Sequence, residues 1–307
     1  MRRQTRPLRT ILFGPLSRPA RFRGSDDVLD AVRSILRGWR VREVASRTAK
    51  KPLIRVARTR RGWRRVSPWR NRPSLVRPEI TPRLIEALCG FHFELLDWYL
   101  AEHPKTLFIH GAAVEFGRRL VVFPALAKAG KSTLAVRLAM SGRRVFCDDV
   151  LPIDTNSAKG FAIGIVPRIR QPLPRHSGAA LRRFVHVRRG LGVGNRLYVT
   201  LRRRELAPYG DTAKIGAVVL LMRRKSGEAS MRRLDQAEAM EKIVLQNFAR
   251  EVPTPLILDT LARVVNGAEC FRLRYVRTDD AAALLDETFG RAGARAAARS
   301  TIRTGRR

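Results

Sequence analysis

Polar and apolar residues follow a helical period in some parts of the chain and a strand period in others, which divides the sequence into segments. Residues 26–36 carry apolar side chains at helical spacing between an acidic start and Gly38, so we predict a short helix there. Apolar stretches at residues 41–45 and 53–57 are typical of strands. These elements predict a small α+β unit over residues 1–80.

A longer helical pattern separates this unit from the rest of the chain. Pro82 stands at the first helical position, apolar residues recur at every third or fourth place, and Pro104 ends the pattern. We predict a connecting helix over residues 81–104 and a larger domain over residues 105–290. The arginine-rich tail at residues 291–307 has little apolar content, so we expect it to be disordered.

The larger domain begins with a change to strand patterns. Apolar runs at residues 107–116 and 118–125 flank a turn at Gly117, which predicts a hairpin. The second run leads directly into an amphipathic helix that ends at Gly142, and a buried strand at residues 145–147 follows. Further strands are predicted at residues 161–166, 197–201, 217–222 and 271–276, and helices at residues 236–250, 255–266 and 280–289. This order predicts an α/β fold.

The loop between the hairpin and its helix is the most informative segment for function. A strand that ends in a tight loop before a helix directs free backbone N–H groups and the positive end of the helix dipole at one point, which suits a polyphosphate. In such loops a lysine reaches the terminal phosphates, and the hydroxyl that follows it binds Mg²⁺. A chance helix start is the alternative. The predicted nucleotide-binding residues are Ala127, Lys128, Ala129, Gly130, Lys131, Ser132 and Thr133.

An acidic pair, Asp148 and Asp149, follows the strand at residues 145–147. Acids at the carboxyl end of a strand beside a phosphate loop lie where α/β sheets bind ligands. One carboxylate can orient Mg²⁺, and the other can take a proton from an incoming hydroxyl. Without the loop such a pair would be a turn or a cap. His110 belongs to the first hairpin strand and is either structural or a hydrogen-bond partner of phosphate or the acids.

The run from His110 to Asp149 resembles the catalytic domain of the HPr kinase/phosphorylase family and its relatives, the HPr-kinase-like serine kinases. In that family a His-Gly pair begins a hairpin, the returning strand delivers the phosphate loop, and an Asp-Asp pair follows the helix. The resemblance implies a phosphate-loop kinase domain of the HPr kinase and phosphoenolpyruvate carboxykinase type, with a mixed sheet and flanking helices. It also implies ATP and Mg²⁺ as cofactors.

The same resemblance implies a role for each matching residue. Lys131 binds phosphate, Ser132 and Asp149 hold Mg²⁺, Asp148 is the general base, and His110 and Asp149 complete the catalytic set. The chain departs from the family at Ala125 and Ala127, where glycine and serine are usual, and no glutamate matches the family's second metal ligand. The first 80 residues do not resemble the family's regulatory domain.

Charge adds candidate partners to this interpretation. Lys and Arg number 62 against 26 Asp and Glu, giving a formal net charge of +36, and residues 1–80 hold 23 basic and 5 acidic residues. Nucleic acid, anionic lipid, a phosphorylated ligand or an acidic peptide would suit such a chain. Since only nine of the basic residues are lysine, codon bias in a GC-rich genome is an alternative cause. Residues 59–77 interleave Trp63 and Trp69 with arginine, which indicates either a single-stranded nucleic-acid site or an exposed connection whose aromatic residues pack on a neighbour.

Cysteine usage and hydropathy bear on compartment. Cys89, Cys147 and Cys270 are odd in number and widely spaced, so we expect neither a disulfide framework nor a zinc site. No apolar run approaches the ~18 residues of a membrane span. We therefore predict a cytoplasmic protein without a membrane partner.

Together these features predict an ATP-dependent kinase that phosphorylates the hydroxyl of a serine in a protein or peptide. An acidic segment of the acceptor would bind the arginine-rich surface. Two alternatives stay open: a nucleotide-binding, nucleic-acid-associated module without kinase activity, and a kinase of a small metabolite such as free serine. Residues 167–174, with Arg168 and Arg170, are a candidate acceptor-side loop or a proline-stiffened connection.

Overall fold

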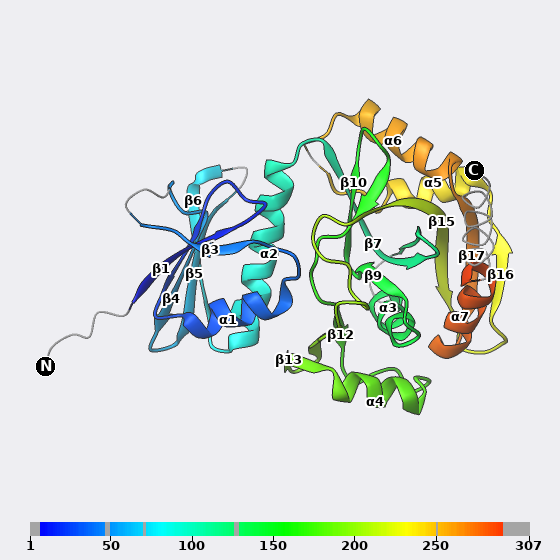
Figure 1. Ribbon diagram of the computed structural model, residues 1–307, viewed down its shortest axis with the longest axis horizontal. Coiled ribbons are helices and arrows are strands. Elements are labelled where there is room, and N and C mark those ends of the chain that lie inside the picture. Colours follow the sequence, from blue (N-terminus) through cyan, green and yellow to red (C-terminus); the bar gives the residue numbers. More distant parts are fainter. Residues whose placement is uncertain (1–6, 47–49, 70–71, 126–128, 250, 291–307) are drawn as a thin grey trace, which may run out of the picture. The chain divides into compact units, whose positions relative to one another are not determined.

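The computed structural model describes residues 7–46, 50–69, 72–125, 129–249 and 251–290 (Figure 1). The chain forms two compact units, Met1–Pro104 and Lys105–Arg307. Helices and strands occur in both, so the α/β composition predicted from the sequence is confirmed. The predicted tail at residues 291–307 lies outside the described residues.

The first unit is a six-stranded sheet with two helices. Its elements are β1 (Leu8–Phe13), β2 (Ala20–Arg23), α1 (Asp26–Ile35), β3 (Val41–Glu43), β4 (Ile54–Thr59), β5 (Gly62–Trp69), β6 (Arg72–Thr81) and α2 (Leu84–Glu102). The strand order is β3-β1-β2-β4-β5-β6, and α1 and α2 pack against each other and against the sheet. Phe13, Phe22 and Phe91 meet between sheet and helix with ring centroids 5.4 to 6.5 Å apart. The helix predicted as a connection therefore packs within this unit.

The prediction of an exposed connection at residues 59–77 is wrong, because β5 and β6 pair there as antiparallel strands. Trp63 is 6% exposed, and its indole N–H donates a hydrogen bond to Asp27 Oδ1 at 3.0 Å. Buried residues alternate with exposed ones along β5, but arginine occupies positions of both kinds. Arg65 is buried and Arg64 is exposed. The alternation of buried and exposed positions that marks a strand therefore does not show as an alternation of apolar and polar residues. The side chain of Trp69 lies outside the described part.

The second unit holds an eight-stranded mixed sheet, a small three-stranded sheet and five helices among its described residues. The elements up to the small sheet are β7 (Thr106–Phe116), β8 (Arg119–Pro124), α3 (Lys131–Met140), β9 (Arg144–Cys147), β10 (Val150–Asp154), β11 (Lys159–Phe161), β12 (Arg168–Arg170), α4 (Ala179–Val187), β13 (Arg189–Val193) and β14 (Arg196–Val199). The remaining elements are β15 (Thr212–Arg223), β16 (Ser230–Arg233), α5 (Gln236–Val244), α6 (Thr254–Asn266), β17 (Glu269–Tyr275), α7 (Thr278–Leu285) and a π-helical turn at Asp286–Gly290.

The large sheet has the order β11-β10-β7-β8-β15-β17-β16, with β9 paired to β7. Strand β15 is parallel to both β8 and β17, and the other pairings are antiparallel. Because β11 pairs with β15 as well as with β10, five of the strands close into a ring. The small sheet has the order β12-β14-β13.

The hairpin predicted at the start of this unit is confirmed. Strands β7 and β8 pair from Gly111↔Pro124 to Phe116↔Arg119. Gly117 and Arg118 form the turn with φ of 54° and 71°, the positive values of the turn type that matches the twist of two paired strands. Strand β7 is longer than β8, and its first half pairs with β10 instead, where His110 lies opposite Val150. The end of β8 and the beginning of β10 therefore meet near the middle of β7.

The core of the second unit covers both faces of the central strands. Leu107 and Ile109 of β7 belong to a buried cluster that includes Ile243 of α5 and Leu261 of α6. The alternate residue Phe108 is also buried, and α3 packs against β7, β9 and α7. Strands buried on both faces give continuous apolar runs, which is why the hairpin was easily recognised in the sequence.

Some predicted elements differ from those observed. Only β11 lies near the strand predicted at residues 161–166, and the helix predicted at residues 236–250 is α5, which ends at Val244. Cys89, Cys147 and Cys270 are all buried, and their thiols are free. In the described ranges, no helix combines the length and apolar character needed to cross a membrane.

Candidate functional site

The predicted phosphate loop connects β8 to α3. Helix α3 begins at Lys131, directly after Gly130, whose φ of +94° lies in the left-handed region. A Cβ at Gly130 would lie 2.7 Å from the hydroxyl oxygen of Tyr275, so both conformation and space require glycine there. The predicted binding residues Ala127 and Lys128 lie outside the described residues.

Tyr275, the last residue of β17, holds the loop from the other side. Its side chain is 1% exposed, and its hydroxyl donates a hydrogen bond to the carbonyl oxygen of Ala129 at 3.0 Å. Burial raises the pKa of Tyr275 to about 12, so the hydroxyl stays protonated and remains a donor at neutral pH. This contact joins residues 146 positions apart, and no local pattern in the sequence indicated it.

Tyr275→Phe is expected to loosen the loop without removing any predicted catalytic group. The substitution leaves the Ala129 carbonyl without this donor, so we expect a loss of about 1 kcal/mol in the free energy of unfolding. The affinity of the loop for a polyphosphate should also fall several-fold, because its backbone N–H groups are held less firmly. Calorimetric titration with a nucleoside triphosphate and urea denaturation measure these two quantities. Tyr99→Phe in the first unit is the control, and an unchanged affinity in Tyr275→Phe would contradict the role of this contact.

Lys131, the first residue of α3, is directed back toward the loop. Its side chain is 6% exposed, and its ammonium donates a hydrogen bond to the carbonyl oxygen of Ala125 at 2.6 Å. Burial lowers the pKa of Lys131, while the charges of Asp149 and Asp148 act in the opposite direction. The ammonium also lies 3.0 Å from Nε2 of His110.

His110 links this lysine to the acidic pair. Its Nδ1 lies 3.2 Å from Oδ1 of Asp149, on the opposite side of the ring from Lys131. A lysine ammonium can only donate, so Nε2 of His110 is the acceptor in this contact, and Nδ1 is the ring nitrogen that faces the Asp149 carboxylate. The backbone fixes this arrangement, because the N–H of Gly111 donates to the carbonyl oxygen of Asp149 at 3.0 Å.

Asp148 is the buried member of the acidic pair. It is 8% exposed, and its Oδ2 accepts a hydrogen bond from the backbone N–H of Arg168 at 3.0 Å. Burial, with the nearby charge of Asp149, raises the pKa of Asp148 to about 7. A carboxylate with that pKa is deprotonated often enough at neutral pH to accept a proton and basic enough to do so effectively.

Most of the predicted site residues are thus brought together. Ser132 joins the group, because its hydroxyl lies 3.5 Å from the carbonyl oxygen of Asp148. Thr133 is half-buried within α3. Of the candidate acceptor loop at residues 167–174, Arg168 meets Asp148 through its backbone, whereas Arg170 is exposed.

Three contributors were missed by sequence reasoning: the Tyr275 hydroxyl, the Ala125 carbonyl and the Arg168 backbone N–H. Two of them are backbone groups, which every residue type can supply. Only the fold selects which backbone groups reach the site, so no residue pattern could have identified them.

The side chains of the site could hold a metal ion only together with a bound ligand. No group of three or more His, Cys, Asp or Glu side chains in the described part of the chain could hold a metal alone. Ser132 and Asp149, whose side chain is 40% exposed, offer oxygen ligands at the helix N-terminus. Mg²⁺ is commonly bound by one or two protein oxygens together with substrate phosphates. These residues therefore suit a Mg²⁺ ion that arrives with a polyphosphate.

The arrangement combines an anion-binding helix start, a buried lysine and a carboxylate that can accept a proton. No protein-family model matches the sequence, and a search of curated proteins finds no significant match.

Proposed function

We propose that the protein is a phosphate-loop kinase of the HPr-kinase-like type that transfers the γ-phosphoryl group of ATP to a serine hydroxyl of a protein or peptide. The observation that carries the proposal is the position of Asp148, a buried carboxylate whose pKa is raised to about 7, beside the helix start that holds Lys131. A helix N-terminus alone would indicate only anion binding. The adjacent base adds a means of activating a hydroxyl.

Phosphate binding is the first task of the site. The free N–H groups at the start of α3 and the ammonium of Lys131 would hold the β- and γ-phosphates. Mg²⁺, when bound by Ser132 and Asp149, would neutralise the charge on the phosphate oxygens. His110 keeps Lys131 and Asp149 at fixed positions through its two ring nitrogens. Positioning and electrostatic stabilisation supply most of the catalysis in phosphoryl transfer.

Proton removal is the second task. Asp148 would accept the proton of the serine hydroxyl as the bond to phosphorus forms. The N–H of Arg168 holds one carboxylate oxygen, Oδ2, which would leave the other oxygen for the acceptor hydroxyl. Since Arg168 begins β12, residues 167–174 adjoin the base and are the proposed acceptor-side segment.

The test is transfer of radiolabel from ATP by the full-length protein with Mg²⁺. Acceptors would be a short acidic peptide containing one serine, the same peptide with alanine in its place, and free serine. We expect label in phosphoserine of the first peptide and none in the alanine peptide. Label confined to free serine would replace the peptide acceptor with a metabolite. Absence of ATP binding by calorimetry would contradict the whole proposal.

A role in single-stranded nucleic-acid binding has less support. Trp63, one of the two aromatic residues behind that hypothesis, is buried and bonded to Asp27 rather than available to stack on a base.

A further inference from the structure

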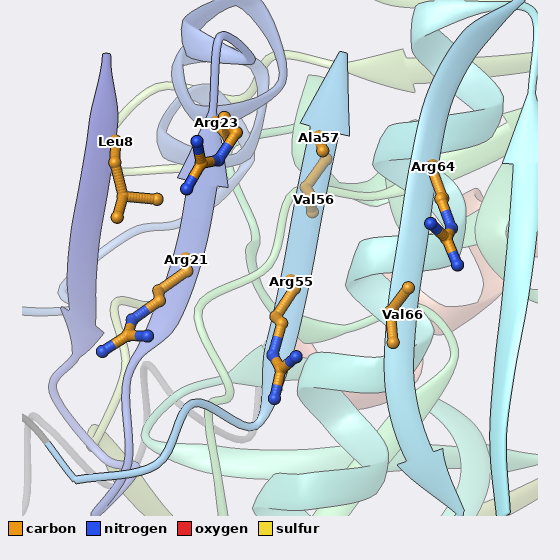
Figure 2. Close-up of a pocket in the computed structure, with 8 residues that line it drawn as sticks. All are labelled: Leu8, Arg21, Arg23, Arg55, Val56, Ala57, Arg64 and Val66. Carbon is orange, nitrogen blue, oxygen red and sulfur yellow. The ribbon is translucent and has the colours of Figure 1, made fainter. Parts of the chain in front are cut away.

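Four arginines of the first unit, Arg21, Arg23, Arg55 and Arg64, lie together on one face of its sheet; we call them the arginine face. Figure 2 shows them on the adjacent strands β2, β4 and β5. They line a pocket of about 590 Å³ whose other lining residues are Leu8, Val56, Ala57 and Val66. None of these eight described residues is acidic.

Strand geometry places these side chains on one surface. Successive side chains of a strand point to opposite faces, so Arg21 and Arg23 lie on one side of β2 while Phe22 packs on the other, against Phe91 of α2. Across the strands Arg21 lies directly opposite Arg55. Arg23 and Arg64 are both paired with Ala57, one from each side. The four guanidinium groups therefore belong to two neighbouring rows across the sheet.

The charges of the arginine face are not neutralised within the described part of the chain. Nearby acids pair with other arginines: Asp26 and Glu43 with Arg9, Asp27 with Arg58, and Glu79 and Glu94 with Arg65. None of the four arginines forms an ion pair with a described residue. In addition, Nε of Arg21 is buried and has no hydrogen-bond partner among the described residues.

Both features reduce the stability of the free protein. Like charges directly opposite each other on paired strands repel, and a buried donor without an acceptor loses the hydrogen bonds that it made to water. An anionic ligand between Arg21 and Arg55 would remove the repulsion between the two charges. Arginine also binds carboxylate through two parallel hydrogen bonds, which gives such a site geometric selectivity.

The rest of the lining indicates which anion. Leu8 is 42% exposed and lies beside Arg23 across β1 and β2, so apolar and cationic positions alternate on this surface. None of the eight lining residues is aromatic, whereas single-stranded nucleic acid is usually held by stacking on aromatic rings. Carboxylates alternating with aliphatic side chains would fit both kinds of position.

We propose that the arginine face binds an extended acidic segment of a polypeptide. Alternate side chains of an extended chain are spaced about 6.6 Å apart, which is the same-face spacing along β2. Acidic side chains at alternate positions would therefore meet successive rows of arginines. This proposal rests on the proposed function, because the acidic segment would be part of the protein or peptide that the kinase phosphorylates. Its binding requires no phosphoryl transfer, so either proposal can fail without the other.

The experiment measures fluorescence anisotropy of labelled probes with the full-length protein. The probes are a peptide in which Glu alternates with Val, the same peptide with Gln for Glu, and oligothymidylate. The test variant is R55Q/R64Q. The matched control is R60Q/R61Q, which removes two charges from the exposed turn between the same two strands. Circular dichroism and thermal denaturation establish that each variant folds.

We expect the Glu peptide to bind and the Gln peptide to fail. R55Q/R64Q should weaken the Glu peptide about tenfold or more, and R60Q/R61Q less than about twofold, because only the first pair loses charge-assisted hydrogen bonds. R55Q/R64Q should also be no less stable than the wild type, since it removes the charge of Arg55 that lies directly opposite Arg21. Equal weakening by both variants would overturn the proposal in favour of general charge. Tighter binding of oligothymidylate with the same loss in R55Q/R64Q would assign the face to nucleic acid, and no binding of any probe would also overturn it.

Discussion

Asp148→Asn is expected to lower the rate of phosphoryl transfer about a thousandfold while ATP still binds, because the amide cannot accept the proton of the acceptor hydroxyl. In the wild type, kcat should rise with pH and level off above an apparent pKa near 7, the value to which burial and Asp149 raise the pKa of Asp148. The variant should lose this dependence. Steady-state kinetics between pH 5.5 and about 8.5 measure it. Asp154→Asn, at the half-buried far end of β10, is the control for activity.

The same substitution should stabilise the fold at alkaline pH. The folded-state pKa of Asp148 lies above that of the unfolded chain, so the native protein retains a proton that the unfolded chain releases. The stability contributed by this proton is complete below pH ~4 and is lost as pH rises to ~7. Asparagine does not titrate in this range, so the variant does not lose this stability as the pH rises. The free energy of unfolding of Asp148→Asn, relative to wild type, should therefore increase by about 2 kcal/mol between pH 5 and pH 8.

Chemical denaturation at the two pH values tests this expectation. Asp154→Asn should act in the opposite direction, because hydrogen bonds from Ser157 lower the pKa of Asp154, and its carboxylate therefore stabilises the fold at neutral pH. A variant at position 148 that is destabilised equally at both pH values would show that the carboxylate is not held in its protonated form.

Lys131→Met is expected to reduce phosphoryl transfer about a thousandfold, through loss of the charge that stabilises the transferring phosphate. ATP binding should weaken as well, since in the proposed site the same ammonium would hold the nucleotide before reaction. Arginine at this position should not restore activity, because the buried space between Ala125 and His110 accommodates a single ammonium group.

The loss of phosphoryl transfer in Lys131→Met should not result from unfolding. Methionine replaces a desolvated cation with an apolar chain of similar length, so the melting temperature should change little or rise. Lys159→Met, an exposed lysine of β11 in the same unit, is the matched control and should retain wild-type transfer. Full activity in Lys131→Met would contradict the assignment of the loop.

Local patterns predicted the elements that carry the site. The apolar runs of β7 and β8, the turn at Gly117 and the helix after Gly130 all depend on interactions between residues near in sequence. In the first unit the same reasoning missed the hairpin of β5 and β6. There, Arg65 is buried although arginine is a residue type that is usually exposed. Glu79 and Glu94 neutralise its charge, but these ion pairs form only in the folded chain.

The sequence alone determined the order of hairpin, predicted phosphate loop, helix and acidic pair, and with it which side chains were candidates for the site. The tertiary structure decided what those side chains contact. The pairing of β7 with both β8 and β10 brings His110 between Lys131 and Asp149, and β17 supplies Tyr275 to the loop. The unpaired charges of the arginine face likewise became visible only from strand register. Periodicity records which face of an element is buried, whereas contacts between distant elements arise from the packing of the whole chain.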